Sequence, residues 1–238
     1  MIMSTSKEHD FLLQSVRIWF NQPEQISHYT HEFIEGPTVA EQYLLNPLPD
    51  SSSVLDVGCG AGRISVYLAE RGYRVNGIDV SEGLLSVARD ISKKRNLDID
   101  FLYSEGKLPY QDEEFDTLIG FKILCYIPTR ELRNENLKEF YRVLKPGGTC
   151  IITQNIVPDE YIEDAKDEHY WSSPASQFGI LERGDNFPLG NGYVHWFTES
   201  DLLNEIRSTD FEIELFESDE EHEGEGYIKL IKLRKPCK

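Results

Sequence analysis

The segment VLDVGCGAGRIS at residues 54–65 constrains the fold more than any other part of this sequence. An apolar run leads into Asp56, Gly58, Gly60 and Gly62 follow at alternate positions, and a helical pattern comes next. Glycines after a buried strand let the backbone approach a ligand closely and direct N–H groups toward an anion. The segment therefore predicts a strand, a ligand-binding turn and a helix.

The rest of the chain continues this alternation of strands and helices. Strands are expected at residues 53–58, 73–81, 99–105, 115–123, 149–157, 211–218 and 226–235. Helices are expected at residues 5–21, 63–72, 82–96, 129–145 and 198–208. This order predicts an α/β fold, with a doubly wound, mostly parallel seven-stranded sheet whose last strand is antiparallel.

We interpret the whole chain, 1–238, as one domain with four segments. Residues 1–50 form an N-terminal helical cap, and residues 51–157 form the cofactor-binding core. Residues 158–197, rich in aromatics, glycine and proline, interrupt the alternation after the fifth strand and are expected to form a substrate cap or lid. Residues 198–238 supply the final helix and strand pair.

Composition narrows the class of partner. The chain carries 42 acidic and 24 basic residues, a net charge of −18, which disfavours binding to nucleic acid. No apolar run is long enough to span a membrane, and the N-terminus lacks the pattern of a secretory signal. The four cysteines have no metal-site spacing, so we expect no metal and a cytoplasmic location.

The end of the second strand indicates what the turn binds. Asp79 lies about 20 positions after the glycines, where a carboxylate accepts hydrogen bonds from ribose hydroxyls. A dinucleotide site needs a third small residue at the position occupied by Arg63, so a nicotinamide cofactor is disfavoured. The pattern D-x-G-x-G-x-G suits an adenosine-containing ligand that lacks a pyrophosphate.

Four motifs together resemble those of class I S-adenosylmethionine-dependent methyltransferases with a Rossmann-like fold. They are VLDVGCGAGRIS, VNGIDVS, EGKLPYQDEEFDTLIGF and RVLKPGGTCIIT, and they cover roughly residues 50–155. The resemblance is greatest to the subgroup that includes ubiquinone- and menaquinone-biosynthesis enzymes and other small-molecule methyltransferases. It implies S-adenosyl-L-methionine as the cofactor.

The resemblance also implies a set of cofactor-binding residues. They are Asp56, Gly58, Cys59, Gly60, Asp79, Val80, Glu105, Gly106 and Phe121. The turn would approach the methionine part, with Asp56 near its ammonium, and Asp79 would bind the ribose. Val80 and the pair Glu105 and Gly106 would contact the adenine, and Phe121 would lie beside the methyl group.

The methyl acceptor is expected between the N-terminal cap and residues 158–197. A neutral amine needs little help from a base, whereas a hydroxyl or an acidic carbon needs one, and histidine is the natural candidate. His195, His169 and His31 are the candidate bases because of their location. The candidate wall of the acceptor pocket consists of Tyr29, Tyr126, Tyr170, Trp171 and Trp196.

These observations favour a transferase that moves a methyl group to an N or O atom of a small molecule by in-line displacement, acting as a monomer or homodimer. Three alternatives remain open at this stage. The chain acts on a peptide or protein, it is a non-catalytic module that binds an adenosyl cofactor, or, least favoured, it is an NAD-dependent oxidoreductase.

Overall fold

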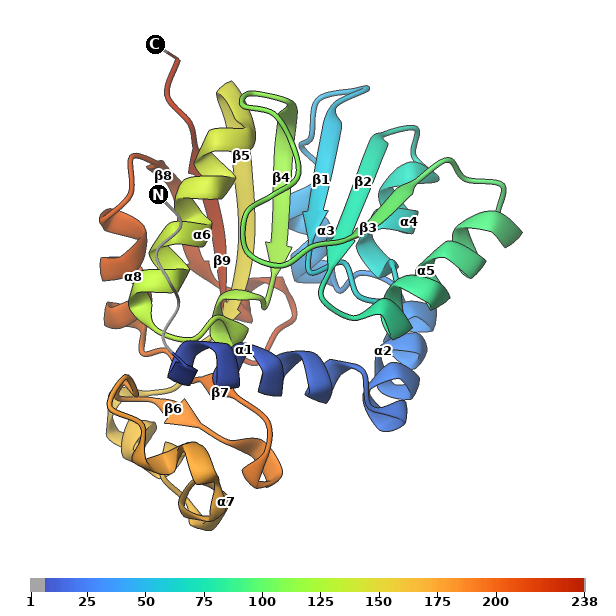
Figure 1. Cartoon of the computed structure of the whole chain (residues 1–238). Helices are drawn as coiled ribbons and strands as arrows, with labels where there is room; N and C mark the ends of the chain where they lie inside the picture. Colours follow the sequence, from blue (N-terminus) through green and yellow to red (C-terminus); the bar gives the residue numbers. More distant parts are fainter. Residues whose placement is uncertain (1–6, 238) are drawn as a thin grey trace.

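The computed structural model describes residues 7–237 and contains one seven-stranded sheet of order β3-β2-β1-β4-β5-β9-β8 (Figure 1). Its strands are β1 (Ser53–Val57), β2 (Arg74–Asp79), β3 (Asp100–Tyr103), β4 (Phe115–Phe121), β5 (Leu144–Asn155), β8 (Glu212–Ser218) and β9 (Ile228–Arg234). The longer helices are α1 (Lys7–Phe20), α2 (Pro23–Glu35), α3 (Val39–Leu45), α4 (Arg63–Ala69), α5 (Glu82–Lys94), α6 (Arg130–Val143) and α8 (Glu199–Arg207).

Strand pairing confirms the predicted sheet. Neighbouring strands from β3 to β5 pair in parallel, and β9 pairs antiparallel with both β5 and β8. Several boundaries differ from the prediction by a few residues, and one of these differences affects the sheet: the helix expected to reach Lys145 ends at Val143. Leu144 instead pairs with Phe115 of β4, so the pairing of β5 begins before the Pro-Gly-Gly turn.

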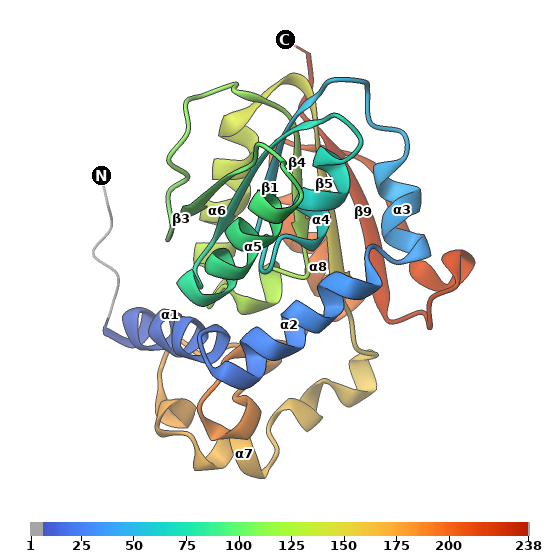
Figure 2. The ribbon, with the colours of Figure 1, turned by 90° about the vertical axis from the view of Figure 1, so that its right-hand side faces the viewer.

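Helices cover both faces of the sheet, as strands with continuous apolar runs require. Leu118 packs with α6 and α8 on one face, and the next residue, Ile119, packs with α3 and α4 on the other. Both side chains are fully buried. Figure 2 shows α3, α4 and α5 together on the second face.

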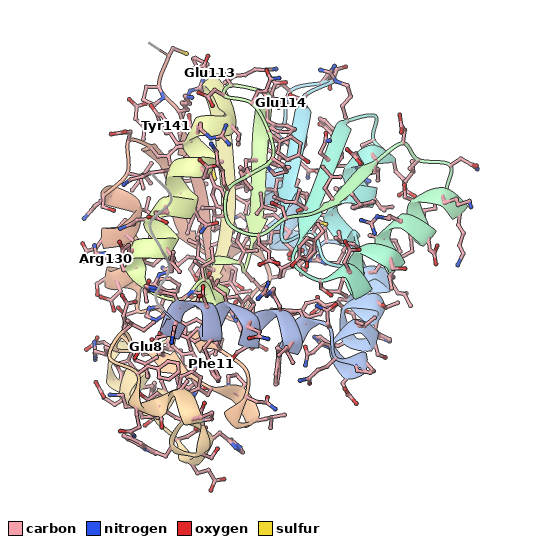
Figure 3. All side chains as sticks on the ribbon, viewed as in Figure 1. Glu8, Phe11, Glu113, Glu114, Arg130 and Tyr141 are labelled. Atoms are coloured by element: carbon pink, nitrogen blue, oxygen red, sulfur yellow. The ribbon has the colours of Figure 1, made fainter. Side chains whose placement is uncertain are left out.

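The N-terminal helices and residues 158–197, here called the insertion, lie at the carboxyl end of the parallel strands. The arrowheads of β1, β2 and β4 point toward α1 in Figure 1, and the insertion lies beyond it. The insertion contains short 3-10 turns, α7 (Glu168–Ser172) and a ribbon of β6 (Asp185–Asn186) and β7 (Val194–His195). Phe11 of α1, labelled in Figure 3, contacts Phe178 of the insertion with ring centroids 5.3 Å apart.

The start of the predicted first helix, residues 5–6, lies outside the described residues. Within residues 7–237, no helix combines the length and the apolar character that crossing a bilayer requires.

Candidate functional site

The glycine turn joins the ends of β1 and β2. The backbone N–H groups of Gly58 and Cys59 donate to the carbonyl oxygen of Ile78, at 2.8 and 3.0 Å. Gly60 N–H donates to Oδ2 of Asp79 at 2.9 Å. We expected the N–H groups of the turn to point toward a ligand. This expectation is wrong for Gly58, Cys59 and Gly60, because their N–H groups hold the turn against the second strand.

Asp79 lies at the carboxyl end of β2, where the sequence predicted a ribose-binding carboxylate. Its second oxygen accepts from the N–H of Ser81 at 2.8 Å, and burial raises the pKa of the carboxyl above its usual value. The region beside Gly60 is open, since nothing lies within 4 Å of the position that a Cβ would occupy there. A carboxylate beside an uncrowded backbone turn fits the ribose and methionine parts of an adenosyl ligand.

Two other turn residues serve packing. A Cβ on Gly62 would lie 3.1 Å from Cβ of Ala88 and 3.2 Å from Cζ of Phe101, and φ at this glycine is +84°. Gly62 thus lets α4 begin close to α5 and β3. Cys59 is buried against the same Phe101, and burial raises the pKa of its thiol, so it fills space rather than acting as a nucleophile.

Asp56 lies within β1 and is 3% exposed. Its Oδ2 accepts a hydrogen bond from Ser65 Oγ at 2.5 Å, and burial raises the pKa of the carboxyl to about 7. A cation that approached this buried carboxyl would favour its ionised form. The structure therefore keeps a group that fits the ammonium of the cofactor, held in place by the first turn of α4.

The N-terminal cap closes over the predicted adenosine end of the site. Arg17 of α1 pairs with Glu105 at 2.5 Å, so the carboxylate expected to contact adenine is engaged by the cap. Oγ of Ser81 donates to the carbonyl oxygen of Phe20 at 3.0 Å, and Gly83 N–H donates to the side-chain oxygen of Asn21 at 3.2 Å. These contacts fix the junction of α1 and α2 at the start of α5.

The other predicted cofactor contacts lie at the same edge of the sheet. Val80 is half-buried directly after β2, and Gly106 has open space around its α-carbon and a φ of +71°. Phe121, half-buried, ends β4. A Cβ on Gly58 would overlap the side chain of Ile123, so the glycine turn contacts the segment that follows β4.

Two of the predicted acceptor-pocket residues meet between the cap and the segment after β4. The side chains of Tyr29 (α2) and Tyr126, in the turn η1 (Leu124–Tyr126), share a hydrogen bond. Burial raises the pKa of Tyr29 to about 12 and also raises that of Tyr126. Phe20 contacts both rings, with centroids 5.7 Å from Tyr29 and 4.8 Å from Tyr126.

The three aromatic candidates of the insertion are placed differently from one another. Tyr170 is buried and stacks on Phe187 at 5.3 Å, within a cluster that includes Leu12 of α1. Trp171 is 60% exposed, and its indole N–H donates to the carbonyl oxygen of Lys166. Trp196 is half-buried beside the ribbon. Tyr170 therefore joins the insertion to the cap, whereas Trp171 faces solvent.

The candidate bases also separate clearly. His31 on α2 is 75% exposed at its side chain and lies 3.9 Å from Glu35, and His169 on α7 is exposed. His195 is 4% exposed, and its Nδ1 lies 2.7 Å from Oδ1 of Asp185. The structure thus gives one of the three histidines a buried, hydrogen-bonded setting.

A buried ion network supports this part of the insertion, and the sequence analysis missed it. Arg133 of α6 is 1% exposed and donates from Nε and Nη2 to Glu205 of α8, at 2.9 and 2.6 Å. The same guanidinium donates to Glu182 of the insertion at 2.7 Å. Arg133 occurs in a strongly polar helix, so only its i+4 spacing from the buried Leu137 indicates that it faces inward.

Glu182, Asp185 and His195 are also the only group of described residues whose ligand atoms lie close enough together for a metal, within 4.8 Å of one another. Their acceptor atoms already have donors. Asp185 accepts from Tyr193 Oη at 2.8 Å and from Glu182 N–H at 2.8 Å, and Glu182 faces Arg133. A guanidinium at this distance disfavours a second cation, so we interpret the group as a hydrogen-bond network.

Comparison with known proteins agrees with this fold. Residues 55–152 match the family of the methyltransferase domain. Over 139 residues the chain is 33% identical to methyltransferase GfsG of Streptomyces halstedii, which covers 57% of this chain and 49% of the relative. It is 33% identical over 112 residues to a ubiquinone biosynthesis O-methyltransferase of Pseudomonas entomophila. This match covers 46% of this chain and 47% of the relative. The chain thus matches about half the length of these curated relatives.

Solved structures extend the likeness to most of the chain. An S-adenosylmethionine-dependent methyltransferase from Methanosarcina mazei superimposes with a TM-score of 0.67 at 25% identity, covering 82% of this chain and 98% of that one. The [4+2]-cyclase SpnF superimposes with a TM-score of 0.61 at 20% identity, covering 83% of this chain and 80% of that one. At this identity the likeness shows a shared fold and nothing about function.

Fold and site together define a Rossmann-like protein built to bind an adenosyl ligand at the carboxyl edge of its sheet. Its core, residues 55–152, matches the methyltransferase domain family, and most of the chain is similar in fold to S-adenosylmethionine-dependent methyltransferases.

Proposed function

We propose that this protein transfers the methyl group of S-adenosylmethionine to an N or O atom of a small molecule, with S-adenosylhomocysteine as the second product. The observation that carries the proposal is the uncrowded glycine turn beside Asp79, at the carboxyl ends of β1 and β2. The O-methyltransferases among its relatives support a small acceptor.

When bound, the cofactor supplies an electrophilic methyl group on a sulfonium. Asp79 is placed to accept hydrogen bonds from the ribose hydroxyls, and the raised pKa of Asp56 marks a buried carboxyl that a nearby ammonium would ionise. In this proposal the cap, which contacts of Arg17 and Ser81 hold in place, excludes water from this edge of the sheet. Alignment and exclusion of water are the main contributions that a protein makes to such a displacement.

The acceptor pocket in this proposal lies between the cap, η1 and the insertion. Phe20, Tyr29 and Tyr126 supply its aromatic wall, while Tyr170 closes the insertion against α1. The protein acts as a monomer or homodimer in this proposal and needs no nucleic acid. The cysteines form no disulfide among residues 7–237, which fits a reducing compartment such as the cytoplasm.

The alternatives differ in what they require. An oxidoreductase needs a small residue at position 63, whereas Arg63 pairs with Glu41 of α3 at 2.5 and 2.7 Å and anchors the cap. A non-catalytic module is the second competitor, because a fold does not by itself fix a function. Action on a peptide is the other competitor, and product analysis separates it from a small acceptor.

Calorimetric titration with S-adenosylmethionine, S-adenosylhomocysteine and NADH tests the proposal. We expect micromolar binding of both adenosyl ligands and none of NADH. Asp79→Ala should weaken adenosyl binding about 100-fold, because two hydrogen bonds to a charged acceptor are lost. Asp90→Ala, which removes an exposed carboxylate of α5, is the matched control and should bind like the wild type.

Thermal unfolding of each variant shows that the protein remains folded, since Asp79 also holds the turn. Binding of NADH, or equal adenosyl affinity in wild type and Asp79→Ala, would contradict the proposal. Adenosyl binding without transfer to a metabolite mixture would favour the non-catalytic module.

A further inference from the structure

The ribbon of the insertion brings an aspartate and a histidine into direct contact. In the antiparallel register Asp185 of β6 pairs with His195 of β7, so both side chains project from the same face. Nδ1 of His195 lies 2.7 Å from Oδ1 of Asp185. Asp185 is fully buried, and Tyr193 Oη and Glu182 N–H complete its hydrogen bonds.

This contact fixes the tautomer of the imidazole. A carboxylate that accepts from Nδ1–H leaves the lone pair on Nε2. Nε2 of His195 makes no hydrogen bond with any residue in the described part of the chain. The ring packs edge-on against Phe197, with centroids 4.6 Å apart, so its orientation is also held from the side.

The ribbon lies next to the ends of β4 and β5. Strand β7 packs against η1, which begins three residues after Phe121. Phe197 forms an isolated β-bridge with Ile156, which directly follows β5. The N–H of Val157 donates to the carbonyl oxygen of Phe197 at 2.8 Å. His195 therefore lies two residues from the point where the insertion rejoins the carboxyl edge of the sheet, close to Tyr126.

We infer that His195 is the proton acceptor of the reaction, that Asp185 and Tyr193 are its positioning residues, and that the methyl acceptor is a hydroxyl group. This inference rests on the proposed function, which allows an N or an O atom as the methyl acceptor, and it assigns the oxygen. A neutral amine attacks with its own lone pair, whereas a hydroxyl becomes a strong nucleophile only as its proton leaves. A histidine held with its Nε2 lone pair available is needed for the second kind of acceptor.

The acceptor oxygen forms a bond to the methyl carbon, the C–S bond breaks, and its electron pair stays on sulfur as the sulfonium becomes a thioether. The hydroxyl proton passes to Nε2 of His195, and solvent takes it up after the ether product leaves. Asp185 accepts the hydrogen bond of Nδ1–H and so stabilises the imidazolium.

Charged and titratable groups lie in the hydrogen-bond network of the histidine and on the elements packed near it. They are Asp185 and Glu182 from the β6 side, Tyr193 from β7, Arg133 from α6, Glu205 from α8 and Cys125 from η1. Arg133 is neutralised by two carboxylates, and Cys125 is a buried thiol whose pKa burial raises to about 11. Among these groups, Asp185 alone contacts the imidazole through a hydrogen bond.

The first test measures transfer of a labelled methyl group to a series of phenols of graded acidity and to benzylamine. We expect transfer to the phenols, and His195→Gln should slow it about 100-fold or more for weakly acidic phenols. The loss should shrink for para-nitrophenol, which is largely ionised without a base. His222→Gln is the matched control, at a histidine that follows β8 and stacks on Tyr43 of α3.

Asp185→Asn tests the positioning role. We expect the acidic limb of the rate–pH profile, present in the wild type, to vanish in His195→Gln and to move in Asp185→Asn. Asp185→Glu should restore part of the rate, because it returns a carboxylate to Nδ1. A purely structural aspartate would change stability and leave the shape of the profile unaltered.

The second test needs no turnover. NMR of the histidine ring nitrogens, with the adenosylhomocysteine complex and with free protein, should show His195 protonated at Nδ1 and unprotonated at Nε2. The opposite tautomer would overturn the inference, as would transfer to benzylamine alone or a larger loss in His31→Gln or His169→Gln. If these results occur while adenosyl binding still depends on Asp79, the proposed function stands and only the hydroxyl acceptor and the base fail.

Discussion

At the scale of single residues, the site uses burial to set protonation. Asp56 lies one residue before the end of β1, Asp79 ends the neighbouring parallel strand β2, and burial raises the pKa of each carboxyl. The carboxyl of Asp79 accepts hydrogen bonds from two backbone N–H groups, whereas that of Asp56 accepts one from the hydroxyl of Ser65. Burial opposes the ionisation of both carboxyls, and the hydrogen bonds that they accept favour it.

Asp56 gives a pH prediction for the ligand-free protein. Its pKa is about 7 in the folded state and about 3.9 in the unfolded chain. The folded state therefore favours the protonated carboxyl. Between the two pKa values the unfolded chain loses the proton of Asp56 while the folded protein keeps it, so the free energy of unfolding falls as pH rises toward 7. Asp56→Asn imitates the protonated form, so its advantage in unfolding free energy over the wild type should grow by about 2 kcal/mol between about pH 5.5 and about pH 8.

Urea unfolding at the two pH values measures this difference. Asp90→Asn, on the exposed side of α5, should show no such growth. A constant difference between wild type and Asp56→Asn at both pH values would refute the raised pKa.

At the scale of elements, Arg133 joins three parts of the chain that are distant in sequence. It lies on α6 and pairs with Glu205 on α8 and Glu182 in the insertion. Its guanidinium also lies 5.1 Å above the ring of Phe197, next to the ribbon. The network therefore couples the position of the His195 ribbon to the helices of the core.

Glu205→Gln should weaken this coupling. Removing one partner of a buried ion pair leaves an incompletely compensated charge and costs about 3–5 kcal/mol, with the lower end expected because Glu182 remains. Urea unfolding measures the loss. Glu163→Gln, which removes one partner of the exposed pair with Arg183, is the control and should change stability little.

An Arg133→Met, Glu205→Leu double variant should recover much of that stability, since it removes both charges together. A loss from Glu205→Gln no larger than that from Glu163→Gln would show that the buried pair contributes little.

Elements also show what the sequence could predict. The strands of the core were predicted correctly because each is a continuous apolar run next to a helix with its own signals, such as Ser81 capping α5. The two-residue strands β6 and β7 were not predicted, since so short a run carries no periodicity. The partnership of Asp185 with His195 depends on that ribbon, so the sequence indicated the histidine by its location and gave no sign of its aspartate.

The candidate cofactor site was more predictable than the acceptor site for the same reason. Gly58, Gly60 and Asp79 occur in short motifs whose backbone geometry is local. The wall formed by Phe20, Tyr29 and Tyr126 needs the cap to fold back across the sheet edge. The role of Arg63 in anchoring α3 likewise depends on a partner 22 positions away.

At the scale of the whole molecule, charge sets which partners are accessible. A net charge of −18 opposes the approach of a polyanion to the average surface of the protein. Fluorescence anisotropy with labelled transfer RNA at about 150 mM salt should therefore show no binding. Saturable binding that persists at this salt concentration would contradict a small-molecule acceptor and reopen RNA as a substrate.

The two edges of the sheet differ in what lies next to them. The cap and insertion gather at the carboxyl edge, while the C-terminus leaves from the opposite edge (Figure 1). Cys237, near that terminus, is exposed, whereas Cys59, Cys125 and Cys150 are buried. The natural chain thus carries one thiol that a maleimide dye or a sensor surface can reach. It allows ligand titrations on immobilised or fluorescent protein without engineered cysteines and with the binding edge left unobstructed.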